Sequence, residues 1–372
     1  MHFAFTDEQE DLRRTVRAFF DDTSSEPELR RLMDSAEGYN PGVWHRMGSE
    51  IGIQGLIVPE EFGGAGCGMI ELGTVMEEAG RALLCAPLLS SAVMATTALL
   101  QCDAPDARKR LLPRLAAGEI VATFALTEDS GRWDAGGVQL AAREDKDGDW
   151  QLSGHKNFVL DGTVADVILT VARTPEGIGL FSVEGDAPGL LRDDLPTLDP
   201  TRRQARLEYQ NVPAVRLRTP GNCWEHVSAV LDRSAAALAV EQVGVAERAL
   251  DMAVEYAKTR HQFGRAIGSF QAVKHLLADV LLEVESARAA AYFALLSADG
   301  GGDDLPTVAG LAKAFCSDAA VQAASQNIQV HGGIGFTWEH SAHLYLKRAK
   351  TSQMLLGDSQ HHREVLAQRI GV

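Results

Sequence analysis

Residues 256–275 have the sequence YAKTRHQFGRAIGSFQAVKH, and this stretch decides the fold prediction for the chain. Upstream of it, apolar residues recur at helical spacing, and Gly264 and Gly268 end that pattern. Ser269 is a suitable N-cap for a second helix. The apolar face of that second helix consists of Phe270, Val273, Leu277, Val280, Leu281 and Val284. The sequence therefore predicts two helices joined by a short corner.

The corner between these helices carries side chains that suit a large cofactor that is both anionic and aromatic. Arg260 can bind a pyrophosphate through two parallel hydrogen bonds, Phe263 offers a flat apolar face, and Gln271 offers donors and acceptors. An ordinary helix end is the alternative, in which Arg260 complements the helix dipole and Gly264 stops the helix. The spacing alone leaves both interpretations open.

Two motifs together resemble the signatures of the acyl-CoA dehydrogenase family. The first is Y-A-K-T-R-x-Q-F-G-x-x-I-x-x-F-Q within residues 256–271, and the second is QVHGGIGF at residues 329–336. The resemblance covers the whole chain. It implies FAD as the cofactor, held partly by a neighbouring subunit, an acyl-CoA thioester as the substrate, and electron-transfer flavoprotein or a similar protein as the electron acceptor. It also implies a homo- or hetero-oligomer, either a dimer or a tetramer.

Length, charge and cysteine usage exclude several classes of protein. A chain of 372 residues with 45% hydrophobic and 23% charged residues is typical of a globular protein of two or three domains. A net charge of −16 argues against nucleic-acid binding and against an anionic membrane surface. No apolar run reaches the roughly 18 residues of a membrane span, so we expect no membrane insertion. The five scattered cysteines predict a reducing cytoplasm rather than a disulfide framework.

Patterns along the chain predict an α+β protein of three domains. Residues 1–120 are predicted to form an N-terminal helical domain, residues 121–219 a small barrel or sandwich of short strands, and residues 220–372 a C-terminal four-helix bundle. The predicted strands include residues 150–152, 167–171 and 180–183. The resemblance implies that the middle domain is a β-barrel that covers one face of the flavin.

Apolar periodicity also predicts where the helices lie. The opening helix is predicted to be amphipathic, with an apolar face formed by Phe3, Phe5, Leu12, Val16, Phe19 and Phe20. Two further N-terminal helices are predicted at residues 70–81 and 90–100. The bundle helices are predicted at about 226–258, 270–298, 305–330 and 339–368, with residues 299–304 (DGGGDD) as a connector.

Residues of the second motif and of the C-terminal segment are also predicted to contact the flavin. Gly332 and Gly333 let the backbone approach a phosphate closely, although a C-cap between helices fits the same sequence. The resemblance adds Gln329 from the same motif, and it adds Asp358 and Gln360 from the segment near the C-terminus.

Two segments of the middle domain resemble family loops beside the flavin. Thr127 begins the sequence TEDSGRWD, which resembles the family's T-E-P-G-A-G-S-D loop, with Trp133 in place of the serine. Phe158 matches the aromatic residue of the family's Trp-Ile-Thr, whereas Leu160 replaces the threonine that hydrogen-bonds the flavin. Because one such hydrogen bond is worth about 0.5–1.5 kcal/mol, we expect FAD binding to survive its loss.

Both positions at which the family carries its catalytic base lack a carboxylate in this chain. In the family, a glutamate removes the α-proton of the thioester while a hydride leaves the β-carbon for the flavin. The resemblance places Leu356 at the usual glutamate position and Ser234 at the alternative position on the first bundle helix. A positioned general base contributes about 10²–10⁴-fold to rate, so its loss matters for function.

Two carboxylates are candidate substitutes for the base. Glu241 lies seven residues after Ser234, on roughly the same helix face but displaced by about 10 Å of helix rise. A structural polar residue is the alternative interpretation of Glu241. Asp358 lies two residues beyond Leu356, where a capping or flavin-contact role competes with catalysis.

Three functions remain open at this point. The first is an acyl-CoA dehydrogenase component, acting alone or as the base-lacking subunit of an α₂β₂ assembly with a glutamate-bearing paralogue. The tail LLGDSQHHR at residues 355–363 resembles such base-lacking subunits, which include actinobacterial enzymes of steroid side-chain breakdown. The second is a non-catalytic FAD-binding partner, and the third is a same-fold flavoenzyme acting on a nitroalkane or a carrier-bound acyl group. We expect no metal site, because no acidic or cysteine ligand completes the histidine pairs at 340/343 and 361/362.

Overall fold

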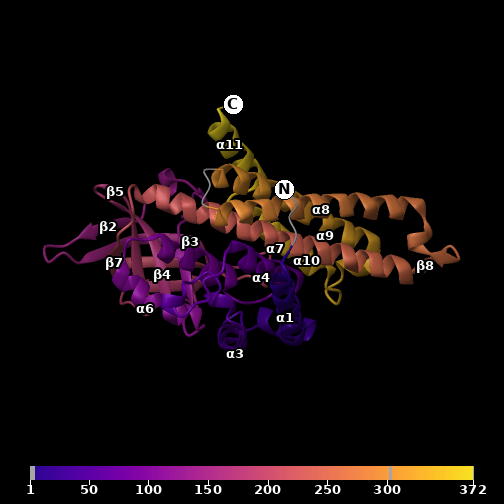
Figure 1. Ribbon diagram of the computed structural model, residues 1–372, viewed down its shortest axis with the longest axis horizontal. Coiled ribbons are helices and arrows are strands. Elements are labelled where there is room, and N and C mark those ends of the chain that lie inside the picture. Colours follow the sequence, from indigo (N-terminus) through magenta and orange to yellow (C-terminus); the bar gives the residue numbers. More distant parts are fainter. Residues whose placement is uncertain (1–4, 301–303, 372) are drawn as a thin grey trace. The chain divides into compact units, whose positions relative to one another are not determined.

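The computed structural model describes residues 5–300 and 304–371 (Figure 1). Phe3 and part of the predicted connector at 299–304 therefore lie outside the described residues. The chain forms two compact units, each built from segments that are distant in sequence. Unit 1 comprises Met1–Arg31, Met69–Leu84 and Ala235–Val372, and unit 2 comprises Leu32–Gly68 and Cys85–Ser234. The division into three consecutive domains stays a prediction.

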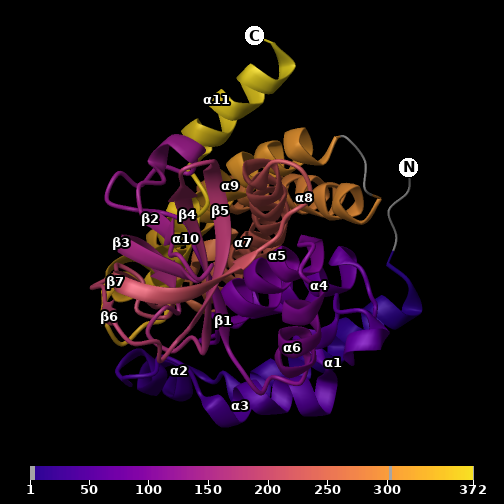
Figure 2. The same cartoon turned by 90° about the vertical axis from the view of Figure 1, so that its left-hand side faces the viewer.

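Unit 2 contains a seven-stranded sheet that closes on itself. Its strands are β1 (Ala122–Ala125), β2 (Ala141–Glu144), β3 (Trp150–Leu160), β4 (Val167–Thr174), β5 (Gly177–Glu184), β6 (Leu190–Asp194) and β7 (Gln204–Leu217). The strand order is β1-β4-β2-β3-β7-β5, and β6 pairs with β7. The additional pairing of β4 with β5 closes the ring, so the structure is a small barrel and not an open sandwich (Figure 2).

Burial of the barrel strands explains why their sequences are rich in apolar residues. β4 is buried along almost its whole length, which fits a strand covered on both faces. Strand side chains with no solvent exposure, on one face of the barrel wall or the other, include Leu152, Ile168, Leu169, Val171, Leu180, Phe181 and Leu207. Tyr209 is also buried, and its hydroxyl forms a 2.9 Å hydrogen bond with Thr170. The buried polar atoms of this pair therefore satisfy each other.

Helices complete unit 2. Its helical elements are α3 (Pro41–Arg46), η1 (Met47–Ile51), η2 (Ile53–Gly55), η3 (Glu60–Phe62), η4 (Leu88–Ala95), α5 (Thr96–Gln101), α6 (Pro105–Ala116) and η5 (Ala135–Gly137), while α2 (Glu26–Met33) spans the boundary between the units. The helix predicted at residues 90–100 is present, although Leu88–Ala95 is wound as a π-helix. The start of α7 also belongs to unit 2.

Long helices build unit 1. They are α1 (Asp7–Thr23), α4 (Met69–Arg81), α7 (Cys223–Thr259) from Ala235 onward, α8 (Gln271–Asp299), α9 (Leu305–His331), α10 (Ala342–Met354) and α11 (Ser359–Ile370). α9 packs against α8, α10 and α11, and α4 packs against α1 and α8. The predicted combination of N-terminal helices, a middle β-barrel and a C-terminal helical bundle is confirmed.

The fourth predicted bundle helix, at residues 339–368, is wrong as a single helix. The structure has two helices there, α10 and α11, separated by residues 355–358. Leu356 and Gly357 adopt left-handed φ values of 60° and 97°, which a continuous helix cannot contain. Asp358 then caps α11, because its carboxylate accepts a 2.7 Å hydrogen bond from the His361 amide.

Two glycines allow α4 and α7 to cross at very short range. A Cβ added at Gly80 would lie 2.0 Å from the carbonyl oxygen of Glu241, and one added at Gly244 would lie 1.9 Å from that of Glu77. Any larger residue would force the two backbones apart. The crossing therefore requires glycine at both positions.

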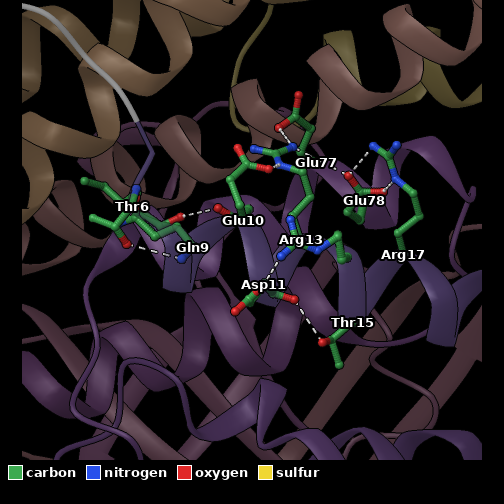
Figure 3. A network of polar contacts seen from close by, with 12 residues as sticks. Thr6, Gln9, Glu10, Asp11, Arg13, Thr15, Arg17, Glu77 and Glu78 are labelled. Carbon is green, nitrogen blue, oxygen red and sulfur yellow. Dashed lines mark hydrogen bonds and ion pairs between the residues drawn. The ribbon is translucent and has the colours of Figure 1, made fainter.

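A network of charged groups joins α1, α4 and α8 beside this crossing (Figure 3). Glu77 and Glu78 each have a side-chain exposure of 1%. Glu77 accepts hydrogen bonds from Arg13 at 2.6 Å, from the Tyr292 hydroxyl at 2.6 Å and from Arg288. Because each buried carboxylate has cationic partners, the network offsets the cost of removing these charges from water.

No helix within residues 5–300 and 304–371 is long and apolar enough to cross a membrane.

Replacing Arg13 with methionine should lower the free energy of unfolding by about 3 kcal/mol, because Glu77 stays buried with one cation fewer. Urea denaturation of the purified chain measures this change. The control is Arg14→Met on the same helix, where the Arg14 side chain is 70% exposed. We expect that control to change stability by at most about 0.5 kcal/mol. Equal losses in the two variants would show that the network does not stabilise the unit.

Candidate functional site

The predicted corner after α7 is a short β-hairpin. β8 (His261–Gln262) pairs with β9 (Arg265–Ala266), and η6 (Ile267–Ser269) leads into α8. Phe263 and Gly264 form the tip with φ values of 53° and 78°, the positive values that a tight hairpin turn requires. α7 itself ends at Thr259, so Gly264 turns the hairpin and does not stop the helix.

The predicted N-cap of α8 is wrong. Phe270 occupies the N-cap position, without a side-chain capping hydrogen bond. Ser269 lies inside the 3-10 turn, where its hydroxyl donates to the Ala266 carbonyl at 2.7 Å. Because the Ser269 hydroxyl bonds to a carbonyl that precedes it in the sequence, it does not accept a hydrogen bond from the first amides of α8.

The structure brings the two sequence motifs together at one end of the helical bundle. The Tyr256 ring, in the last turn of α7, stacks on the His331 ring at the end of α9, with centroids 4.3 Å apart and planes inclined by 29°. Nδ1 of His331 lies 2.8 Å from the Asn327 carbonyl oxygen, which fixes the ring. The Arg260 hairpin and the turn η7 (Gly332–Phe336) therefore start from adjacent helix ends.

The predicted cofactor-binding groups at this end of the bundle are open to solvent. Phe263 is 91% exposed, and the other predicted residues here are also exposed: Arg260, Gln271, Gln329, Gly332 and Gly333. A Cβ added at either glycine would meet no atom within 4 Å, so the backbone can be approached closely. An accessible guanidinium, accessible amides and a flat ring are thus available at one place.

Asp358 and Gln360 are not part of this corner. They follow the turn between α10 and α11, which lies against the first half of α9: the Ser359 hydroxyl forms a 2.7 Å hydrogen bond with Asp318. His331 lies 13 residues beyond Asp318, which corresponds to about 20 Å along the helix. The predicted contacts in unit 1 therefore form two separate groups.

A buried lysine holds the turn between α10 and α11. Nζ of Lys313 donates to the Ser317 hydroxyl at 2.9 Å and to the carbonyls of Gln353 and Gly357 at 3.2 Å each. The sequence analysis did not identify this residue. The available signal was a single charged residue inside the apolar helical stretch GLAKAF.

In unit 2, the predicted residues Thr127 and Phe158 come from paired segments. The Thr127 hydroxyl donates to the Asn157 carbonyl at 2.6 Å, and the Asn157 amide donates to the Thr127 carbonyl at 2.8 Å. Phe158 follows directly, at an irregularity of β3 where φ is 59° and 43% of the residue stays exposed. The bulge therefore turns this aromatic ring out of the strand pattern.

A second buried lysine fixes the loop that follows Thr127. Nζ of Lys156 donates to the Glu128 carboxylate at 2.7 Å and to the Leu126 carbonyl at 2.8 Å. The other Glu128 bonds come from the amides of Gln139 and Leu140. Burial lowers the pKa of Lys156 to about 8, although the Glu128 carboxylate opposes this shift. The loop is therefore attached to β3 through one ion pair that the sequence analysis missed.

The candidate bases are engaged in structural contacts. The Glu241 carboxylate accepts a 3.0 Å hydrogen bond from Arg348, and the side chains of both residues are at most 3% exposed. Arg348 also donates to the carbonyls of Leu83 and Leu84. Ser234 is buried, and its hydroxyl donates to the Val230 carbonyl at 2.7 Å. These contacts support the structural interpretation of Glu241.

Three protein-family models match the chain in order. They are the acyl-CoA dehydrogenase N-terminal domain at residues 6–119, the middle domain at 123–212 and the C-terminal domain at 221–371. The chain belongs to the acyl-CoA dehydrogenase family.

Relatives of known sequence or structure cover the chain from end to end. It is 36% identical over 360 residues to acyl-CoA dehydrogenase IpdE2 of Mycobacterium tuberculosis, covering 97% of this chain and 95% of the relative. A variant of the Tcur3481-Tcur3483 steroid ACAD is similar in structure, with a TM-score of 0.88, 32% identity and 98% coverage of each chain. The ChsE4-ChsE5 complex from Mycobacterium tuberculosis gives a TM-score of 0.91 at 27% identity, covering 100% of this chain and 99% of that one.

Family membership makes the chain an FAD-dependent oxidoreductase, and the exposed groups fit this cofactor. The guanidinium of Arg260 suits a pyrophosphate, and the bare backbone at Gly332 and Gly333 leaves room for close approach. Bound FAD supplies an acceptor for a hydride.

A cavity within unit 2 does not by itself select a ligand. It has a volume of about 1040 Å³ and lies beside the ends of β4, β5 and β7. Its charged lining residues are Arg173, Arg216, Arg218, Asp103, Glu144 and Glu176. Three cations face three anions, so the wall favours neither an anionic nor a cationic guest.

Within residues 5–300 and 304–371, no three histidine, cysteine or acidic side chains are grouped to hold a metal ion.

The purified chain, or its complex, should be yellow from bound FAD. Arg260→Met should weaken FAD binding by roughly ten- to a hundredfold, because one charge-assisted contact is worth about 1.5–3 kcal/mol. Titration of the apoprotein with FAD, followed by flavin fluorescence, measures this. Arg265→Met is the control, since Arg265 lies in the same hairpin with its guanidinium 4.0 Å from the Phe270 ring centroid. An absence of flavin absorbance after reconstitution with excess FAD would contradict the assignment.

The buried Lys313 should make stability depend on pH. Burial lowers the pKa of Lys313 from 10.5 to about 7, so between these values the unfolded chain holds a proton that the folded chain has released. The folded state is therefore favoured as pH rises through this range, and the full cost of charging the amine is present below pH 7.

We expect the stability of the native chain to rise by about 3 kcal/mol relative to Lys313→Met between pH 7 and about 9.5. Urea midpoints measured for both proteins at each pH give the difference. Parallel pH curves would show that Lys313 keeps an ordinary pKa.

Proposed function

We propose that this chain is the base-lacking subunit of a heteromeric acyl-CoA dehydrogenase. In that assembly a glutamate-bearing paralogue supplies the group that removes the α-proton, and a 2-enoyl thioester is the product. The observation that carries this proposal is Leu356, a buried hydrocarbon side chain at the position that family resemblance assigns to the usual glutamate. A leucine cannot accept a proton, so the chain needs a base from elsewhere.

The surroundings of the other candidates support an external base. Glu241 is paired with Arg348 inside the bundle, and the Asp358 carboxylate caps α11. Using either as the base would require breaking a contact that supports the fold. Two of the similar structures are named as pairs, Tcur3481-Tcur3483 and the ChsE4-ChsE5 complex, and this supports a mixed assembly.

The substrate and the cellular setting follow from the same assignment. One similar structure is described as a steroid ACAD, which makes a steroid-derived acyl-CoA the first thioester to test. We further propose a cytoplasmic enzyme, a dimeric or tetrameric assembly, and electron-transfer flavoprotein or a similar protein as the electron acceptor. Each of these proposals extends the family assignment and has its own biochemical test.

Anaerobic mixing with a panel of acyl-CoA thioesters tests the function. We expect the flavin absorbance to bleach when the glutamate-bearing paralogue is present and to persist when the chain is alone. Bleaching by the isolated chain that disappears in Glu241→Gln would assign the base to Glu241 and refute the proposal. An absence of bleaching in every combination would favour a non-catalytic partner or a flavoenzyme for nitroalkanes or carrier-bound acyl groups.

Leu356→Glu provides the complementary gain of function. The isolated variant should bleach on the order of 10²-fold faster than the native chain, because a general base contributes that much or more. Leu355→Glu is the matched control, since Leu355 is also buried and differs in position by one residue. Equal rates in the two variants would show that position 356 does not face the reacting thioester.

A further inference from the structure

Lys313 lies inside the helical bundle of unit 1 with no solvent exposure. Its three described hydrogen-bond acceptors, the Ser317 hydroxyl and the carbonyls of Gln353 and Gly357, are neutral. Burying an ammonium group against neutral acceptors is costly. A lysine at such a place therefore calls for an explanation beyond packing.

Two of these acceptors belong to the turn that ends α10. The last carbonyls of a helix have no partner within the helix. Lys313 binds one of these, the carbonyl of Gln353 in the last turn of α10, and also the carbonyl of Gly357 in the turn that follows. Between them, Leu356 has a φ of 60°, which is unfavourable for a residue with a Cβ. Gly357 has a φ of 97°, and a Cβ there would lie 2.3 Å from the His361 ring. The lysine thus holds a turn that local backbone preferences do not favour.

The same face of α9 holds the turn at further points. The Ser359 hydroxyl hydrogen-bonds to the Ala314 carbonyl at 3.2 Å and to the Asp318 carboxylate at 2.7 Å. The side-chain amide of Gln353 (Nε2) donates to the Asp318 carboxylate at 3.1 Å. Positions 313, 314, 317 and 318 lie on one helix face. The turn is therefore attached to α9 on both sides of Leu356.

We propose that Lys313 is a positioning residue for the flavin and substrate site. By binding the carbonyls on either side of Leu356, it fixes the turn that presents position 356 and leads to Asp358 and Gln360. This inference rests on the proposed function, because those three positions are assigned to the site by family resemblance. It adds a residue outside both sequence motifs.

The test compares Lys313→Met with the native full-length chain, each reconstituted with FAD. We expect the FAD dissociation constant to rise about tenfold and the visible flavin spectrum to change, since the two hydrogen bonds from Lys313 to the turn are lost. Amide hydrogen exchange at residues 355–361 should accelerate by at least about tenfold, while exchange in the barrel strands stays unchanged. Arg17→Met is the control: it removes the pair between Arg17 and Glu78, far in sequence from the turn, and should leave the FAD constant unchanged.

A double-mutant cycle separates positioning from general destabilisation. Gly357→Ala disturbs the same turn directly, so its effect on FAD affinity should not add to that of Lys313→Met. Additive effects, or a Lys313→Met protein with lower thermal stability but native FAD affinity, spectrum and exchange, would overturn the proposal. If Lys313→Met does not fold, Lys313→Gln gives the same comparison with a smaller loss of donors. Failure of the proposed function would appear separately, as an absence of bleaching with every thioester and partner.

Discussion

The close crossing of α4 and α7 is the constraint on which unit 1 depends. Gly80 and Gly244 each face the backbone of the opposite helix, so the two axes approach as nearly as backbone atoms permit. Such proximity leaves no room for side chains between the helices. Charged residues next to the crossing must therefore be directed to its sides, where they meet arginines from other elements.

This arrangement explains why the carboxylates of the bundle serve structure. Glu77 and Glu78 on α4 bind arginines of α1 and α8, and Glu241 on α7 binds Arg348 of α10. A buried carboxylate with a guanidinium partner is stabilised as the anion and is held in place. The two positions that family resemblance assigns to a proton acceptor carry Leu356 and Ser234 instead. Charge in this unit thus supports packing, and the chemistry of proton removal is proposed to come from a second subunit.

The cofactor-binding end of the bundle has the opposite character. Tyr256 and His331 stack where α7 and α9 end, and this contact joins the two motifs through residues that are 75 positions apart in the sequence. Beyond the stack, Phe263 and the glycine turn are exposed. A rigid base that carries exposed recognition groups suits the binding of a large ligand, because little ordering is needed when the ligand arrives.

The sequence by itself determined the family, the succession of a helical, a strand-rich and a second helical segment, and the residues of the two motifs. Those features depend on local patterns: apolar residues at helical or alternating spacing, glycines at turns, and short signatures of fixed length. The same local patterns led to the two errors, because residues 339–368 remain helical in periodicity across a left-handed break, and Ser269 is a good N-cap residue in isolation. Only the tertiary structure decided the distant partners of Glu241, Lys156 and Lys313, since each of these side chains binds at least one group 28 or more residues away. A charged side chain has the same local pattern whether it is solvated or buried, and its role follows from which distant groups the fold brings within hydrogen-bonding distance.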